Sequence, residues 1–208
     1  MSLHDLASLG AGFSHESFGS QAIFRCALNA LSQPGRCITV EHDAQVPRSG
    51  KAAGAVLLLA LLDSDCTLWL SPSLQGSDAA AWLRFHTGCQ MVSQPDRAMF
   101  AWVGEGDAMP LLSSFSQGSD SEPDFSATCI IDVPQMHTDA NIDSCWTLNG
   151  PGIQNLSHLT VEGLPEDFVL QWAANHAGFP RGVDLFLATQ TQLLGLPRTT
   201  SIQLSGGL

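Results

Sequence analysis

The sequence is poor in charge, and above all in positive charge. Of its 208 residues only 13% are charged, and 8 Lys and Arg stand against 20 Asp and Glu, which gives a formal net charge of −12. A chain this acidic lacks the basic surface with which proteins bind nucleic acids. With so few charges, the surface is either partly covered by a partner or rich in neutral polar residues. The composition leaves both alternatives open.

Lysine occurs only once, as Lys51. No G-x-x-x-x-G-K-S/T motif surrounds it, so a phosphate-binding P-loop is excluded. A pyridoxal phosphate enzyme needs a lysine for its Schiff base, and Lys51 lies in a polar loop, so no cofactor is expected. The sequence also lacks a G-x-S-x-G elbow and any H-x-x-x-H or H-E-x-x-H pair among its seven histidines. Neither a hydrolase of that type nor a metal site is therefore expected.

Six cysteines are present, but none stands in a C-x-x-C pair or a zinc-binding spacing. The N-terminus has neither the basic region nor the continuous apolar core of a signal peptide. The longest apolar run, residues 54–62, is too short to span a bilayer. These features predict a cytoplasmic protein with reduced cysteines and no membrane segment. A disulfide framework is the second alternative.

Apolar residues recur at helical and strand spacings and predict the secondary structure. Helices and strands alternate in the first half: helix 24–31 ending at Pro34-Gly35, strand 37–41, an all-apolar helix 52–62, strand 66–71, a helix from Ser77 to Gly88, and strand 98–103. Strands dominate afterwards: a short helix 111–115, strands 127–133 and 144–149, a helix with Pro165 in its first turn, and strand-like segments 183–189, 192–197 and 199–204. Polar loops are expected over 116–126 and 134–143.

This order of elements predicts an α/β fold, with helices layered around a mixed sheet. The chain carries neither an internal repeat nor a low-complexity linker. One domain is therefore expected over residues 15–204, with a loosely ordered N-terminus at 1–14 and a tail at 205–208.

Three arginines lie in segments that could hold an anion. Arg84 stands near the end of an expected helix, where the helix dipole favours a cation. Arg181 precedes an expected strand, and Arg198 follows the next one. A guanidinium at a strand end can grip a carboxylate or phosphate with two hydrogen bonds. The alternative is an internal ion pair, either of Arg181 with Asp184 or of Arg198 with Asp63 or Asp65.

Seven segments, read together and in order, resemble one protein family. They are FR at 24–25 with SQPG at 32–35, DSD at 63–65 with WL at 69–70, LRFHT at 83–87, SQP at 93–95, GPGI at 150–153, FP at 179–180 with GVD at 182–184, and PRTT at 197–200. Each is weak alone, but together they cover nearly the whole chain from about residue 15 to 204. On these segments the sequence is identified as a member of the PhnH family, the H subunit of the bacterial carbon–phosphorus lyase core complex.

The resemblance implies a cytosolic protein of phosphonate breakdown. Such H subunits assemble with the G, I and J subunits of the complex and form homodimers in isolation. Their three-layer, mixed-sheet fold is similar to that of pyridoxal-phosphate-dependent transferases, but without the cofactor. They support the formation of ribose 1-alkylphosphonate 5-triphosphate from ATP and an alkylphosphonate, and catalysis is placed on the I subunit. No catalytic residue is implied for the H subunit, so this chain is not expected to turn over alone.

The charged segments shared with the family have two interpretations. In one, residues brace strand ends and shape an interface; these are Arg25, Asp63, Asp65, Arg181 and Asp184. In the other, a cleft binds nucleotide or phosphonate; its residues are Arg84, His86, Thr87, Arg198 and Thr199. We favour bracing, because the family's chemistry is placed on another subunit and the net charge of −12 opposes anion binding. Locally, residue 86 is expected to be a structural histidine, and residues 63–65 a turn rather than a metal site.

Overall fold

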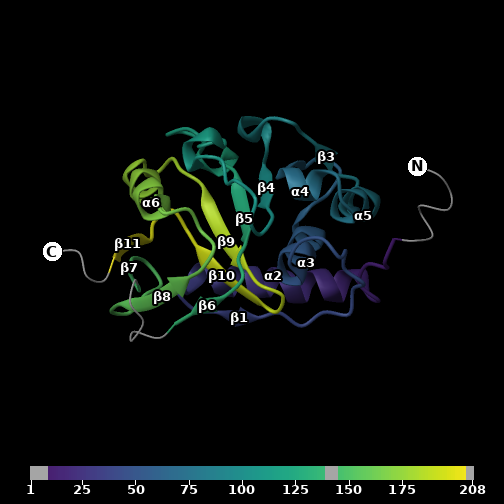
Figure 1. Cartoon of the computed structure of the whole chain (residues 1–208), viewed down its shortest axis with the longest axis horizontal. Helices are drawn as coiled ribbons and strands as arrows, with labels where there is room; N and C mark the ends of the chain where they lie inside the picture. Colours follow the sequence, from purple (N-terminus) through teal and green to yellow (C-terminus); the bar gives the residue numbers. More distant parts are fainter. Residues whose placement is uncertain (1–8, 139–144, 205–208) are drawn as a thin grey trace.

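Two β-sheets and the helices packed on them make up the fold of residues 9–138 and 145–204, the part of the chain that the computed structural model describes (Figure 1). The strands are β1 Ile38–Thr39, β2 Thr67–Leu70, β3 Gln90–Met91, β4 Phe100–Val103, β5 Thr128–Asp132, β6 Met136–His137, β7 Trp146–Asn149, β8 Ser157–Val161, β9 Asp184–Ala188, β10 Gln192–Leu196 and β11 Ser201–Leu204. The helices are α2 Glu16–Ser32, α3 Ala52–Leu61, α4 Pro72–Gln75, α5 Asp78–Thr87 and α6 Phe168–Ala177, with 3₁₀ turns η1 Pro95–Arg97, η2 Leu112–Ser114 and η3 Pro123–Phe125. The expected tail at 205–208 lies outside the described residues.

The larger sheet is mixed, as the sequence predicts. Its strand order is β1-β10-β9-β5-β4-β2-β3. Strands β9, β5, β4, β2 and β3 run parallel, whereas β10 pairs antiparallel with β9, and β1 antiparallel with β10. The smaller sheet, β11-β7-β8-β6, is antiparallel. The α/β class with a mixed sheet is therefore confirmed.

Side chains on the two faces of the larger sheet belong to two separate hydrophobic cores. On β2, Leu68 and Leu70 belong to the core that includes residues of helices α2, α3 and α5. Trp69 between them belongs to the core that includes residues of α6 and the smaller sheet, where its ring contacts that of Phe115. In β4 the same alternation places Trp102 in the first core and Val103 in the second. Both faces are covered, which explains why these strands read as nearly continuous apolar runs.

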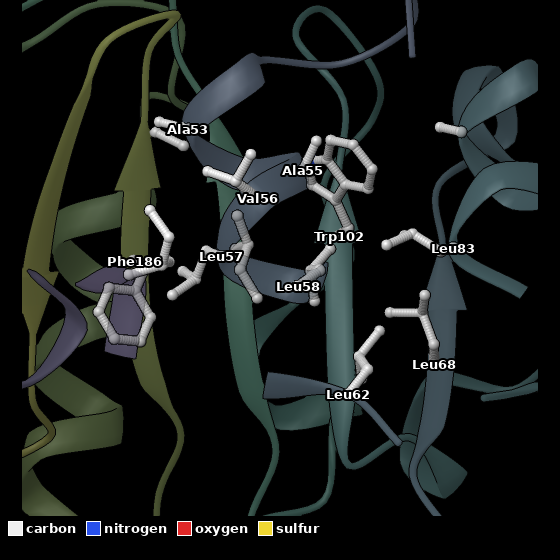
Figure 2. Packing of buried hydrophobic residues seen from close by; sticks show 14 of the residues in the cluster. Ala53, Ala55, Val56, Leu57, Leu58, Leu62, Leu68, Leu83, Trp102 and Phe186 are labelled. Atoms are coloured by element: carbon white, nitrogen blue, oxygen red, sulfur yellow. The ribbon is translucent and has the colours of Figure 1, made fainter. Parts of the chain in front are cut away.

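Helix α3 lies against the larger sheet, and the middle of the helix is buried on every side. Six of its ten residues are buried, and Figure 2 shows Trp102 of β4 and Phe186 of β9 on two sides of it. Helices α2 and α5 also contact it. A helix enclosed in this way needs no polar face. The apolar pattern over 52–62 therefore predicted both the helix and its burial.

Helix α5 begins and ends at the residues that the sequence marks. The hydroxyl of Ser77 accepts a hydrogen bond from the backbone N–H of Ala79 at 3.1 Å. Gly88 closes the helix with a φ of 72°, in the left-handed region. The serine thus satisfies a donor that has no partner within the helix.

We expect Ser77→Ala to lower the free energy of unfolding by about 1 kcal/mol, because the Ala79 N–H loses its acceptor. Urea unfolding followed by tryptophan fluorescence measures the change. The control is Ser17→Ala, an exposed position within α2, which should alter the free energy by less than about 0.5 kcal/mol. Equal stability of Ser77→Ala and wild type would show that the hydroxyl contributes nothing.

Three elements of the second half differ from the sequence prediction. Helix α6 begins at Phe168, and Pro165 lies in the turn before it, where its carbonyl oxygen accepts from the Phe168 N–H at 3.0 Å. Strand β8 was not predicted, and β6 lies inside the expected polar loop 134–143. Only Leu159 of β8 is buried. A strand of a small sheet with one covered face carries too weak an apolar pattern for prediction.

Residues 9–14 are held by hydrogen bonds, although a loose N-terminus is expected over 1–14. The carbonyl oxygen of Gly10 lies 2.9 Å from Trp82 Nε1 and 2.9 Å from His86 Nε2. The hydroxyl of Ser14 donates to the carboxylate of Asp43. These partners are 29 to 76 positions away along the chain, so local sequence patterns cannot reveal them. Residues 1–8 lie outside the described residues.

The cysteines are reduced, as the sequence analysis predicts. All six cysteines are free thiols, and four of them are buried, so the alternative of a disulfide framework is wrong. Of the helices in the described ranges, none combines the length and the apolar character that crossing a membrane requires.

Candidate functional site

The guanidinium of Arg198 joins three chain segments near the end of β10. Its Nε and Nη2 donate to the carboxylate of Asp184 at 3.2 and 2.7 Å, and its Nη1 donates to the carbonyl oxygens of Pro123 and Pro180 at 3.0 and 3.1 Å. Nη2 also donates to the hydroxyl of Ser126. The five N–H donors of a guanidinium are thereby all used inside the protein. The arrangement is a brace, and it leaves no donor for the ligand that the second interpretation assigns to Arg198.

The expected pairing of Arg181 with Asp184 is wrong. Asp184 pairs with Arg198, whose side chain is only 12% exposed. Arg181 instead lies 3.3 Å from Asp120, and both of these side chains are largely exposed. A solvated pair of this kind contributes little to stability, so the two arginines that flank β9 and β10 have unequal roles.

Residues 63–65 form a turn, as predicted. Oδ1 of Asp63 accepts from the backbone N–H groups of Asp65 and Cys66 at 2.9 and 3.1 Å. Hydrogen bonding with Cys66 and Asp65 lowers the pKa of this carboxyl. The pairing of Arg198 with Asp63 or Asp65 is therefore wrong as well. Nowhere in residues 9–138 and 145–204 do three or more His, Cys, Asp or Glu residues gather as metal ligands would.

The residues of the expected anion-binding cleft lie at opposite ends of the larger sheet. Arg84, His86 and Thr87 belong to α5, whereas Arg198 and Thr199 follow β10. Strand β10 and strand β3, which follows α5, are five positions apart in the sheet order, or about 24 Å at ~4.8 Å per strand. Figure 1 shows α5 and β11 on opposite sides of the molecule. The structure does not bring these five residues together.

At the α5 end, His86 and Thr87 line a cavity of about 450 Å³ together with residues of α2 and α3. The carboxylates in its described lining are those of Glu16 and Asp63, and neither Lys nor Arg lines it. The Thr87 hydroxyl is already used, since it donates to the Leu83 carbonyl oxygen at 2.8 Å. A cavity with this charge does not suit an anion.

A different set of polar residues meets at the carboxyl edge of the parallel strands. Asp132 ends β5, Glu105 follows β4, and Gln190 follows β9, while Lys51 directly precedes α3. Open α/β sheets bind ligands at this edge, where the order of strands reverses. Strand β3 lies on one side of β2, and the next strand of the chain, β4, lies on the other side of β2. The order of strands therefore reverses between β2 and β4, beside these residues.

Asp132 is the buried centre of this edge, with 3% of its surface exposed. Its Oδ1 accepts from Nε1 of Trp102 at 2.9 Å, and its Oδ2 from the backbone N–H of Lys51 at 2.8 Å. Burial raises the pKa of Asp132 to about 7, although both hydrogen bonds and the Lys51 ammonium act to lower it, while Glu105 raises it further. A buried carboxyl with a pKa so far from its usual value, lying beside a cavity, is typical of functional sites.

The cavity beside Asp132 has a volume of about 340 Å³ and is lined by charged residues of both signs. Lys51 Nζ lies 2.5 Å from Oε2 of Glu105. Arg48 also lines the cavity, and within the described residues its guanidinium makes neither a hydrogen bond nor an ion pair. We call this cavity, with Arg48, Lys51, Glu105 and Asp132, the edge site.

The edge site was not predicted from the sequence, although two of its residues stand at recognisable positions. Asp132 is an acid that closes the apolar strand ATCIID, and Lys51 is the only lysine of the chain. The residues are 81 positions apart. Their proximity follows from the strand order, which no local pattern records.

Fold and edge site together define an α/β protein with a mixed sheet and a charged cavity at its carboxyl edge. The chain belongs to the PhnH family, because the family model described as "Bacterial phosphonate metabolism protein (PhnH)" matches residues 11–203. The resemblance carried by the seven segments is thereby confirmed.

Two relatives extend over nearly the same length. The chain is 36% identical over 192 residues to the alpha-D-ribose 1-methylphosphonate 5-triphosphate synthase subunit PhnH of Rhizobium meliloti (strain 1021), covering 92% of this chain and 94% of that protein. It is 30% identical over 186 residues to HtxG of Stutzerimonas stutzeri, a protein named as a candidate C-P lyase subunit, covering 89% and 87%. The similarity therefore concerns whole chains rather than one shared motif.

Proposed function

We propose that this chain is a subunit of a carbon–phosphorus lyase complex in phosphonate catabolism. In that complex it supports the formation of ribose 1-alkylphosphonate 5-triphosphate from ATP and an alkylphosphonate. The observation that carries the proposal is the 36% identity, over 92% of the chain, to a named subunit of the synthase. The partners we propose are the G, I and J subunits.

Within the complex the chain has a non-catalytic or co-catalytic role. The guanidinium of Arg198 is fully engaged as a brace, which supports a structural part for the PRTT segment. Helix α2 exposes Phe18, Phe24 and Leu28 beside the exposed Arg25. Apolar side chains gathered on one helix are typical of a surface that meets a partner. This supports the interface role expected for Arg25, and a homodimer when the partners are absent.

Several finer properties belong to the same proposal. The single domain over residues 15–204 is located in the cytoplasm, and its fold is similar to that of pyridoxal-phosphate-dependent transferases without their cofactor. The contacts of Lys51 support the absence of the cofactor, because its ammonium is paired with Glu105 and its backbone N–H is bonded to Asp132.

Co-expression with the G, I and J subunits of the same organism tests the proposal. We expect this chain to co-purify with all three in one complex, and its omission to abolish synthase activity of the remainder. The control is the same set without this chain. Two results would contradict the proposal: a chain that stays alone while the other three assemble, or turnover of ATP and methylphosphonate by this chain without partners.

A further inference from the structure

We propose that the edge site binds a phosphate or phosphonate group through Arg48 and Lys51. These are two of only eight cationic residues in the chain, and they line the same cavity. Both the loop that carries them and the charges around them favour a small tetrahedral oxyanion there.

The loop that carries the two cations is held in shape at each of its residues. The carboxylate of Asp78 accepts from the backbone N–H groups of Arg48 and Ser49 at 2.8 and 3.2 Å. Gly50 has a φ of 84°, and a Cβ built on it would lie 2.2 Å from the Trp102 ring. Only glycine fits such a position. The loop is thus positioned before any ligand arrives, which reduces the entropic cost of binding.

The charge of the cavity favours an anion in spite of the net acidity of the chain. Arg48 is exposed, and within the described residues its guanidinium makes neither a hydrogen bond nor an ion pair, so its planar donors are available for two oxygens of one group. Asp132 carries only part of a negative charge at pH 7, since burial raises its pKa to about 7 and about half of the carboxyl is then protonated. The other carboxylate in the described lining of the cavity is that of Glu105, whose side chain is 45% exposed, while the Asp78 carboxylate is engaged by the backbone N–H groups of Arg48 and Ser49.

Glu105 occupies the position that a ligand anion would take. Its carboxylate lies 2.5 Å from Lys51 Nζ, and the residue follows the end of β4. We expect an incoming phosphate to displace it towards solvent. The backbone N–H groups of Lys51 and Ala52 are not available to the anion, because they already bond to Asp132 and to the Gln190 side chain.

Titration of the purified chain with inorganic phosphate, methylphosphonate, ATP and acetate, each followed by calorimetry, tests the inference. Phosphate, methylphosphonate or ATP should bind, and Arg48→Ala and Lys51→Ala should each weaken binding about tenfold or more, the typical effect of losing a charged hydrogen bond. Glu105→Gln should strengthen binding several-fold, because it releases Lys51. The matched control is Arg36→Ala, an exposed arginine bonded to the Gln33 side chain, which should change nothing.

The relative affinities identify the source of the group. Tightest binding of ATP points to the nucleotide, and tightest binding of methylphosphonate points to the phosphonate substrate. Three results would overturn the inference: no binding of any of the three below about 10 mM, affinities unchanged by Arg48→Ala, or acetate binding as tightly as methylphosphonate. Arg48 is exposed, so Arg48→Ala keeps the test valid even if Lys51→Ala does not fold.

This inference deepens the proposed function and rests on it for the choice of methylphosphonate and ATP. The two can fail separately. Binding is measured on the chain alone, whereas the subunit role is measured by co-purification.

Discussion

Arg198→Ala is expected to lower the free energy of unfolding by about 3 kcal/mol or more. The substitution removes five donors at once and leaves the Asp184 carboxylate, which is 26% exposed, without its cation. The carbonyl oxygens of Pro123 and Pro180 lose their partner too. Removing one member of a mostly buried ion pair costs more than the pair contributes, because the other charge stays desolvated.

Urea unfolding followed by fluorescence of the five tryptophans measures this loss. Arg181→Ala is the matched control, since its pair with Asp120 is exposed on both sides, and it should cost less than about 0.5 kcal/mol. Arg198→Lys should be intermediate, because an ammonium cannot reproduce the planar set of donors. If Arg198→Ala lowers the free energy of unfolding by less than about 1 kcal/mol, the contacts of Arg198 stabilise the fold no more than one ordinary hydrogen bond does.

The free energy of unfolding is expected to fall as pH rises from about 4 to 7, and Asp132 is the cause. Burial raises the pKa of Asp132 from 3.8 to about 7 in the folded chain. Between these two values the folded state binds a proton that the unfolded state has lost, so stability decreases with pH. The stability that the protonated Asp132 contributes to the folded state is fully present below its pKa in the unfolded chain, 3.8, and is lost as pH rises through its folded pKa of about 7. Its size is of the order of 4 kcal/mol.

Asp132→Asn isolates this contribution, because an amide does not titrate. The difference in unfolding free energy between wild type and Asp132→Asn should change steadily between pH 4 and 7 and level off above. The control is Asp107→Asn at the same edge of the sheet. Burial acts to raise the pKa of Asp107, but hydrogen bonds from Ser71 and Ser73 bring it below its usual value, so this variant should parallel wild type above pH 5. Parallel profiles for Asp132→Asn would show that this carboxyl is ionised throughout.

Local sequence patterns predicted the structure correctly where the feature depends on residues of a single helix. Ser77 and Gly88 marked the ends of α5, because capping involves only residues within one turn. The all-apolar stretch 52–62 predicted a buried helix, because a helix covered on every side must be apolar on every side. Strand β8 escaped prediction for the opposite reason, since its single buried residue is Leu159.

The candidate site depended on which elements lie side by side, and there the sequence was a poor guide. Arg198 was considered with Asp63 and Asp65, but its partner is Asp184, 14 positions away on β9. Arg84 and Arg198 were grouped because both stand in family segments, yet they lie at opposite ends of the sheet. Asp132 and Lys51 were not grouped at all, yet they are hydrogen-bonded.

By itself, the sequence determined the α/β class, the ends of its best-marked helix, the family, and the absence of a nucleic-acid-binding charge. Each of these follows from composition, from periodicity along one element, or from motifs in order. Only the tertiary structure decided that Arg198 is a brace and that Asp132, Lys51, Arg48 and Glu105 share one cavity. The physical reason is that the spacing of apolar residues along one element depends on which of its faces are buried. Which side chains come into contact depends instead on the order of the strands, and that order is set by packing between residues far apart in the chain.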